Sequence, residues 1–437
     1  MLKSVTYSKV VSSVFLLLCF YYILLVFSTD NNSGKGFWKE INDGWWNDDD
    51  INVSLEDSTK IQPIIGGLSG IKLLRYFNDN LDYLNKHIPK HFHPYNNNYN
   101  QGNTTNASSN KVVVSSYYDL FWKFILSNKL DTQSMIEVLT RDVDPLNSVH
   151  SHNDYWRALP LFDALLHGVN SVEADVWLVE DYDNTTLAVG HNNLYLNPEH
   201  KNLKKLYLDP MVYMLNEINH DNNVTYGMFY NSPETTTFLF IDFKSEDSVK
   251  TYNVLVESHL STISRYLTYR RGTPSNDGTI ENTIVWKPIT IILTGNYPDL
   301  HGHEDEMLKP YIFFDIDFDD FTSKEAAIQI LKEKRDAVLI TSSSMSKLIA
   351  SCYSNSEDYE SYSGIRKLPF YPREMAHFEI RCIKNKINIA HEVNLETRIW
   401  GVPEWPIHIR NTLWKQQYNE LNSNFLNTND LDAIIAF

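Results

Sequence analysis

Short apolar runs alternate with longer amphipathic segments from about residue 147 to the C-terminus, and this alternation limits the fold more than any other feature. The runs are rich in β-branched and aromatic residues and lie at 148–153, 170–178, 237–244, 289–295, 312–318, 337–344, 397–402 and 424–430. Helix-like segments separate several of them, at 158–166, 209–218, 248–267, 323–334 and 407–421. Eight strands that alternate with helices predict an α/β fold in which a parallel sheet closes into a (β/α)₈ TIM barrel.

A doubly wound open sheet is the main alternative to the barrel. Such a sheet should carry a Gly-rich phosphate-binding turn after an early strand, and the sequence has none. A short extra run at 187–190 predicts a hairpin arm that ends at His191. Helices predicted at 117–128 and 132–139 lead into the barrel, so the barrel domain is placed at 116–437.

The N-terminus differs in composition from the rest of the chain. Residues 10–27 form an 18-residue apolar stretch that contains two serines, follows two lysines and ends at a polar segment. This stretch is short for a bilayer span and long for the core of a cleaved signal. Residues 1–29 are therefore expected to be either a signal anchor or a signal peptide, which puts the barrel in the secretory pathway, lumenal or extracellular.

Residues 30–115 are predicted to be a linker that is partly disordered, because they include an Asn- and Ser-rich run. Acceptor sequences for N-glycosylation occur at Asn31, Asn52, Asn103, Asn106, Asn184 and Asn223. They are weak support for a secreted glycoprotein, since a chain rich in Asn, Ser and Thr contains several by chance. Outside the apolar stretch the cysteines are Cys352 and Cys382, which form either one disulfide or two buried thiols.

Composition excludes two classes of protein. Apolar residues make up 43% and aromatic residues 13% of the 437 residues, which is enough for a large core and excludes wholesale disorder. The formal net charge is −17. Binding to a nucleic acid depends on concentrated Lys and Arg, so no nucleic-acid partner is expected.

Carboxylates occur within two of the apolar runs, where a strand would be buried. Glu173 and Asp175 are two positions apart in the run SVEADVWL, and Asp242 and Lys244 have the same spacing at the end of TFLFIDFK. Residues i and i+2 of a strand face the same side, so each pair projects together. Buried like charges are costly unless a cation or a shared proton compensates them. The pattern predicts a metal site at the C-terminal ends of neighbouring barrel strands.

Histidines occur at the same strand ends. His150 and His152 follow the first run, and His191 closes the predicted hairpin. Three carboxylates favour one hard ion, Mg²⁺ or Ca²⁺. A zinc-dependent amidohydrolase-like site is the alternative, because it also begins with His-x-His and could use Asp430. That alternative ranks lower because the later runs at 289–295, 312–318 and 337–344 end without histidine.

Other polar residues have weaker support from the sequence. Arg398 and Trp400 share one face of the seventh strand, where the first could hold a phosphate oxygen and the second could form an apolar wall. Asp315 and Asp317 are interpreted as a solvent-facing strand end, and His301 and His303 as solvated loop residues. Asn427 and Asp430 are expected to cap the last helix.

Several separated motifs then occur in a recognisable order: HSHNDYWRALPLFDALLHGVNSVEADVWL, VGH, LFIDFK, AHEVNLETRIWGVPEWPIHIRNTLW and LNTNDL. Over roughly 147–437 the chain resembles the fungal altered inheritance of mitochondria protein 6 family. That family is placed within the PLC-like phosphodiesterase superfamily, with the glycerophosphodiester phosphodiesterases and the sphingomyelinase D toxins. The resemblance implies a (β/α)₈ barrel with one divalent ion and two catalytic histidines.

The resemblance also implies roles for single residues. His152, His191 and Lys244 would be catalytic, Glu173, Asp175 and Asp242 would bind the metal, and Trp400 would line the substrate site. His150 and Arg398 are added as substrate-binding candidates because of their positions. The chain has His152-Asn153-Asp154 where glycerophosphodiesterases have His-Arg-Gly. The particular substrate of those enzymes is therefore not assigned to this chain.

The expected function is that of a divalent-metal-dependent phosphoric diester hydrolase acting on a glycerophosphodiester or a phospholipid head group, with the membrane as a partner through the N-terminal segment. A catalytically silent barrel that serves as a membrane-associated scaffold is the alternative. The family name suggests an association with mitochondria, although the N-terminal segment lacks the Arg-rich amphipathic character of a transit peptide.

Overall fold

The computed structural model describes residues 67–82, 117–181, 184–220, 225–274, 280–299, 308–354 and 373–437. The apolar stretch at 10–27, His301, His303 and five of the six glycosylation sequences lie outside these ranges; the five are those at Asn31, Asn52, Asn103, Asn106 and Asn223. Within the described ranges, no helix is long and apolar enough to cross a membrane.

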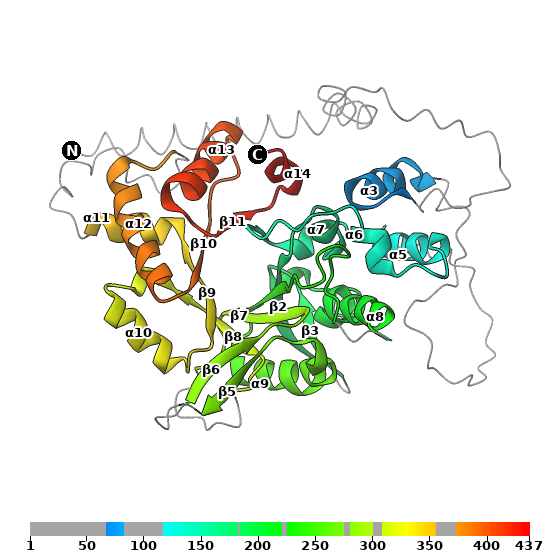
Figure 1. The fold of residues 1–437 in the computed structure, drawn as a ribbon, viewed down its shortest axis with the longest axis horizontal. Helices are drawn as coiled ribbons and strands as arrows, with labels where there is room; N and C mark the ends of the chain where they lie inside the picture. Colours follow the sequence, from blue (N-terminus) through cyan, green and yellow to red (C-terminus); the bar gives the residue numbers. More distant parts are fainter. Residues whose placement is uncertain are drawn as a thin grey trace, which may run out of the picture. The chain divides into compact units, whose positions relative to one another are not determined.

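The eight predicted strands form one closed parallel barrel (Figure 1). They are β1 (Val149–Ser151), β2 (Ser171–Asp181), β4 (Thr237–Phe243), β7 (Ile289–Gly295), β8 (Ile312–Asp317), β9 (Val338–Ser344), β10 (Glu396–Trp400) and β11 (Phe425–Thr428). Each strand pairs with the next, and β1 pairs with both β11 and β2, which closes the ring. The predicted TIM barrel is therefore confirmed.

Helices cover the outside of the barrel (Figure 1). They are α7 (Phe162–Leu166), α8 (Asp209–Ile218), α9 (Ser248–Asn253), α10 (Lys324–Glu333), α11 (Met345–Ser354), α12 (His377–Glu392), α13 (Ile407–Lys415) and α14 (Leu431–Ile435). The helix predicted at 248–267 continues from α9 through a π-helical and a 3₁₀ segment to Tyr266. In the described ranges, the helices that precede the barrel are α3 (Gly70–Asp79), α5 (Tyr117–Asn128) and α6 (Met135–Thr140).

The two faces of the barrel strands bury different side chains. On β2, Val172, Ala174 and Val176 are fully buried in the large apolar cluster between the strands and the helices. A smaller separate cluster, which includes Phe240 and Phe313, fills part of the barrel interior. Since successive strand residues alternate between faces, the carboxylates of β2 must point to the interior side.

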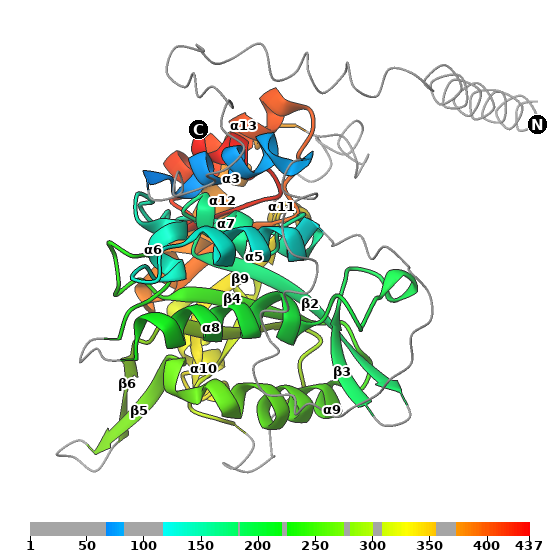
Figure 2. The ribbon, with the colours of Figure 1, turned by 90° about the vertical axis from the view of Figure 1, so that its right-hand side faces the viewer.

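Two hairpins are added to the barrel. The predicted arm is confirmed and is longer than expected, because β3 (Asn184–Val189) pairs antiparallel with the second half of β2 (Figure 2). A second antiparallel hairpin, β5 (Tyr269–Pro274) with β6 (Ile280–Val285), precedes β7 and was not predicted. The first hairpin ends beside His191 and so matters for the site.

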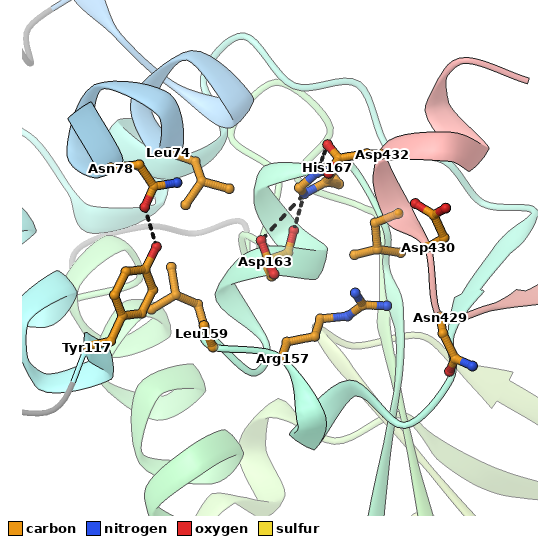
Figure 3. Close-up of a pocket in the computed structure, with 12 residues that line it drawn as sticks. Leu74, Asn78, Tyr117, Arg157, Leu159, Asp163, His167, Asn429, Asp430 and Asp432 are labelled. Carbon is orange, nitrogen blue, oxygen red and sulfur yellow. Dashed lines mark hydrogen bonds and ion pairs between the residues drawn. The ribbon is translucent and has the colours of Figure 1, made fainter. Parts of the chain in front are cut away.

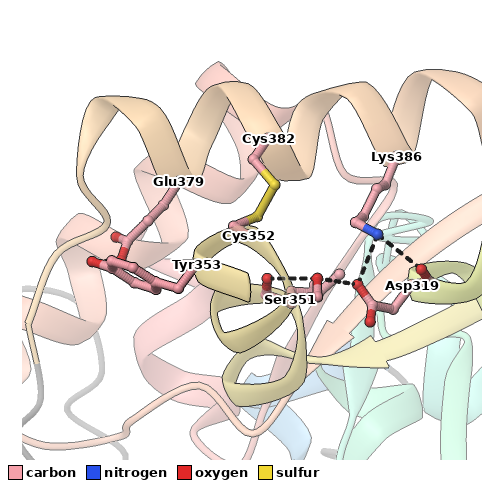
Figure 4. Close-up of a disulfide and its surroundings, with 8 residues drawn as sticks. Asp319, Ser351, Cys352, Tyr353, Glu379, Cys382 and Lys386 are labelled. Atoms are coloured by element: carbon pink, nitrogen blue, oxygen red, sulfur yellow. Dashed lines mark hydrogen bonds and ion pairs between the residues drawn. A yellow bond between two sulfur atoms is a disulfide. The ribbon is translucent and has the colours of Figure 1, made fainter. Parts of the chain in front are cut away.

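Cys352 of α11 and Cys382 of α12 form a disulfide, with their Cα atoms 5.9 Å apart (Figure 4). The sequence left open whether these cysteines form one disulfide or remain two buried thiols, and the structure has the disulfide. Polar contacts beside the disulfide join the same elements, since Asp319 Oδ1 lies 3.0 Å from Lys386 Nζ and accepts from Ser351 Oγ at 2.6 Å. The C-terminal part of the barrel wall is therefore held covalently and by charge.

Candidate active site

Glu173, Asp175 and Asp242 converge at the C-terminal end of the barrel. Asp175 pairs in register with Asp242 across β2 and β4, and Glu173 is one interior position further into the barrel. One carboxylate oxygen from each residue lies within 4.8 Å of the other two. The convergence that the i, i+2 spacing predicts is thus present, and the three residues could hold one metal ion.

The cluster is electrostatically strained without a cation. Burial, together with the charges of Glu173 and Asp242, raises the pKa of Asp175 to about 7. Burial also raises the pKa of Asp242, although Lys244 opposes this shift. Lys244 Nζ lies 2.8 Å from Asp242 Oδ2 and 3.3 Å from Asp175 Oδ2. Arg398 is 3.9 Å from Glu173 but also pairs with Asp315 at 3.2 Å, so Lys244 and Arg398 together leave carboxylate charge that a further proton or a divalent ion must balance.

The donor set fits a hard divalent ion. Among the described residues, Asp242 Oδ1 is buried and has no hydrogen-bond donor. Gly295 leaves room for this oxygen, because a Cβ atom at that position would lie 1.9 Å from it. Oxygen ligands alone suit Mg²⁺ or Ca²⁺ better than zinc. The proposed zinc ligand Asp430 instead caps α14 and pairs with Arg410 at 2.6 Å, which removes the acid that the amidohydrolase alternative needs.

The two predicted catalytic histidines lie on either side of the carboxylates. His152 Nε2 is 3.7 Å from Glu173 Oε2, and His191 Nδ1 is 3.2 Å from Asp175 Oδ2. The Oδ1 atom of Asn429 lies 3.0 Å from His152 Nδ1. Asn153 Nδ2, an amide donor, also lies 3.0 Å from His152 Nδ1, so two amide groups hold this side of the ring and Nε2 faces Glu173 in either tautomer.

Tyr155 and Asn153 belong to the site but were not predicted. The Tyr155 hydroxyl lies 2.8 Å from Asp175 Oδ2 and 3.3 Å from His191 Nδ1, and its pKa is raised by burial and by Asp175. It therefore remains a proton donor. Asn153 adopts a left-handed conformation, with φ of 49°, and its backbone N–H donates to Glu173 Oε2 at 2.9 Å. The available signal was the polar HNDYW segment directly after the first strand.

Arg398 and His150 lie in the barrel interior rather than at its mouth. Both are almost fully buried, and both contact the Phe240 ring, the guanidinium at 4.7 Å from its centroid. Arg398 donates to Asn427, Ser342 and Asp315, and its Nη1 is 3.9 Å from Glu173 Oε1. These contacts place Arg398 beneath the carboxylates, where it is positioned to orient Glu173.

The solvent-facing interpretation of Asp315 is wrong, and so is the capping role expected for Asn427. Asp315 is 8% exposed and accepts from Arg398 at 3.2 Å, because its side chain points into the barrel, where Arg398 also lies. Asp317 is only partly buried and pairs with Lys347 at 2.7 Å. Trp400, two residues beyond Arg398, is 44% exposed at the end of β10.

A pocket of about 280 Å³ lies beside the site but not over the carboxylates (Figure 3). It is lined by α3, α7 and the segment that leads into α14. His167 bridges its two walls, with Nδ1 2.7 Å from the Asp163 carbonyl oxygen and Nε2 3.2 Å from Asp432 Oδ1. These contacts tie α14 to the barrel and so hold the segment that carries Asn429. None of the predicted site residues lines this pocket.

Comparison with known proteins identifies the family. A domain described as "AIM6-like phosphodiesterase domain" matches residues 137–315. "Altered inheritance of mitochondria protein 6" of Kluyveromyces lactis is 36% identical over 420 residues, covering 87% of this chain and 90% of the relative. The proteins of that name from Saccharomyces cerevisiae and Lachancea thermotolerans are 37% and 36% identical and cover 84% and 74% of the chain, or 86% and 75% of the relatives. No solved structure matches. The chain belongs to the altered inheritance of mitochondria protein 6 family.

Proposed function

We propose that the protein is a divalent-metal-dependent phosphoric diester hydrolase acting on a glycerophosphodiester or a phospholipid head group. The observation that carries the proposal is the trio Glu173, Asp175 and Asp242 with one imidazole on each side. The match to a phosphodiesterase-type domain supports the same class of reaction. The site chemistry supports a phosphodiester, and the choice of a glycerophosphodiester or a phospholipid head group comes from the resemblance to the PLC-like phosphodiesterases.

The three carboxylates would hold one Mg²⁺ or Ca²⁺ ion. When bound, such an ion supplies Lewis-acid stabilisation of the charge that develops on a phosphoryl oxygen. Lys244 would neutralise a second phosphoryl oxygen through its ammonium group. Its pKa is kept above the ordinary lysine value by Asp242 and Asp175, which outweigh the opposing effect of burial.

The imidazoles would move the protons. As the nucleophilic oxygen bonds to phosphorus and the ester P–O bond breaks, one of His152 and His191 accepts the proton of the nucleophile. The other donates a proton to the leaving alkoxide, so charge balances over the reaction. The Asn429 contact fixes the ring of His152, and the Tyr155 hydroxyl and Asp175 fix that of His191. These contacts keep the imidazoles oriented toward the cluster.

Hydrolysis of bis(p-nitrophenyl) phosphate by the full chain, with magnesium, calcium or a chelator, tests the proposal. We expect metal-dependent hydrolysis that falls by about 10²–10⁴-fold in His152→Ala and is lost in Glu173→Ala. His220→Ala is the matched control, since this exposed histidine lies between the end of α8 and the start of β4, whereas the cluster lies at the C-terminal ends of the strands. A folded, metal-supplied protein without activity on this or natural diesters would favour the scaffold alternative.

We further infer that the domain matures in an oxidising compartment. Disulfides such as Cys352–Cys382 form and persist outside the reducing cytosol. The apolar stretch at 10–27 agrees with entry into the secretory pathway, whereas the names of the relatives point to mitochondria. Protease protection and endoglycosidase treatment of cell fractions would distinguish the secretory pathway from mitochondria. Full cytosolic exposure of the barrel with free thiols would contradict the inference.

A further inference from the structure

The most exposed large apolar side chains of the described residues gather in loops that follow barrel strands. They are Tyr195 at 85%, Leu194 at 80%, Trp405 at 71% and Trp156 at 61% exposure. Single exposed apolar residues are ordinary, but the four highest values in one region are not. We call these four residues the apolar rim.

The rim flanks the proposed active site on two sides. Leu194 and Tyr195 follow His191 by three and four residues, and the Trp156 ring packs against the His191 ring at 5.3 Å between centroids. On the other side, Glu404 Oε1 accepts from the Asn429 backbone N–H at 3.0 Å, and Asn429 in turn contacts His152. Each half of the rim is thus joined to one of the two imidazoles.

The rim is electrically neutral in an acidic protein. The segments HNNLYL (191–196) and WGVPEWP (400–406) contain one carboxyl group, that of Glu404. That group turns inward, since its Oε2 is buried and its Oε1 is occupied by Asn429. Beside Trp156, the charges of Asp154 and Arg157 cancel, because the buried Asp154 carboxylate pairs with Arg157 at 3.4 Å. Trp and Tyr side chains prefer the interface between water and lipid, and a neutral apolar surface meets no repulsion from zwitterionic head groups.

We propose that the apolar rim docks on a zwitterionic phospholipid bilayer, so that the diester attacked is the head group of a lipid held in the membrane. A lipid phosphodiester lies at the bilayer surface, which requires the mouth of the site to face that surface. The apolar stretch at 10–27 of the same chain favours a membrane over a protein partner or a second copy. The identity of the substrate rests on the proposed function, whereas docking itself does not.

Position-specific labels test docking independently of catalysis. The full chain with Cys19→Ser carries a single added cysteine, Tyr195→Cys or Trp405→Cys, labelled with nitrobenzoxadiazole and mixed with phosphatidylcholine vesicles. Trp286→Cys is the matched control, because Trp286 is 52% exposed but precedes β7 at the opposite end of the barrel. We expect a blue shift at 195 and 405 and none at 286. No shift at 195 and 405, or equal shifts at all three, would overturn docking.

Hydrolysis then tests the consequence for the substrate. In Leu194→Ser/Tyr195→Ser/Trp405→Ser we expect hydrolysis of vesicle phosphatidylcholine to fall at least about tenfold, since burial of even one such side chain is worth about that factor. Hydrolysis of soluble glycerophosphocholine should be unchanged, which also shows that the variant is folded. Trp286→Ser should affect neither substrate. Equal losses on both substrates, or a blue shift that grows with protein concentration before vesicles are added, would contradict the bilayer as the occupant.

The two proposals can fail separately. Labels that shift in a protein that hydrolyses neither substrate would keep docking and reject the phosphodiesterase. Hydrolysis without any label shift would keep the enzyme and reject docking.

Discussion

At the residue scale, the proposed site depends on the close contacts of the Asp175 carboxylate. Asp175 accepts from Tyr155, faces Lys244 and His191, and lies beside Glu173 and Asp242. Its raised pKa follows from this crowding, since burial and two like charges disfavour its ionised form. A bound cation and a bound proton are therefore expected to compete for the same carboxylate.

This competition predicts how metal binding depends on pH. Because the pKa of Asp175 in the folded protein is about 7 and its ordinary value is 3.8, the metal-free folded state holds a proton that the unfolded state releases. The stability due to that proton is present at low pH and is lost as the pH rises to about 7. We expect magnesium to raise the melting temperature more at pH 8 than at pH 6. Equal shifts at both pH values, or the same pH dependence in Asp175→Asn, would contradict this.

Gly295 provides a second prediction at the residue scale. A Cβ atom there would lie 1.9 Å from Asp242 Oδ1, and its φ of +73° disfavours any side chain. Gly401 has a similar φ of +71° but no atom within 4 Å of its Cβ position. We expect Gly401→Ala to lose about 1–2 kcal/mol of folding free energy from backbone strain, and Gly295→Ala to lose more, because the clash with Asp242 adds to the same strain.

Only Gly295→Ala should also lose the thermal stabilisation by magnesium, because only there is a carboxylate displaced. Thermal melts of both variants with and without magnesium measure the difference. A full magnesium response in Gly295→Ala would show that Asp242 Oδ1 is not needed by the ion.

At the element scale, the eight strands could be predicted because each is buried on both faces. Such strands read as continuous apolar runs, which sequence patterns identify well. The convergence of Glu173, Asp175 and Asp242 could also be predicted, since it follows from strand periodicity and from parallel strands ending together. Both are local or topological properties.

The residues that were missed depend on long-range contacts instead. Tyr155 reaches Asp175 from a 3₁₀ turn, and Asp315 is buried because Arg398 approaches it from a strand 83 residues further along the chain. Neither contact has a periodic signature in the sequence. Helix α12 is different, because its buried Ile380, Ile383, Ile387 and Ala390 have helical spacing that could have identified it.

The disulfide gives a prediction at the element scale. It closes a loop of 30 residues between α11 and α12, and a loop of this length is expected to contribute about 3–4 kcal/mol by restricting the unfolded chain. Urea unfolding of Cys352→Ala/Cys382→Ala should show a loss of about this size. A reducing agent should destabilise the wild type and leave the double variant unchanged. An equal effect of the reductant on both proteins would contradict the assignment.

At the scale of the whole molecule, the barrel has one weak join. β1 is three residues long and has one registered pair with β2, Ser151 with Val172, whereas β2 and β4 share six. Polar side chains bridge this join instead. His150 Nδ1 contacts Ser171 Oγ at 2.8 Å, Asn153 N–H donates to Glu173, and Tyr155 reaches Asp175. Most of these bridging groups belong to the proposed active site.

This arrangement predicts where the barrel opens. We expect the amides of 149–153 to exchange hydrogen faster than those of 238–243, and magnesium to slow exchange at 149–153 most. Hydrogen exchange measured by mass spectrometry, with Glu173→Gln as the control that removes the magnesium effect, checks this. Uniform protection around the barrel, or a magnesium effect confined to α12, would contradict it.

Because β1 is short, the side chains that close the barrel between β1 and β2 are largely those of the proposed active site. A substitution of Glu173 or Tyr155 is expected to weaken the join between β1 and β2 as well as to impair the proposed catalysis. A loss of activity alone would therefore not tell a structural role of these residues from a catalytic one. Conversely, under the proposed function a phosphodiester and its ion bound between the imidazoles would link β1 to β2, and the barrel would be most rigid in that complex.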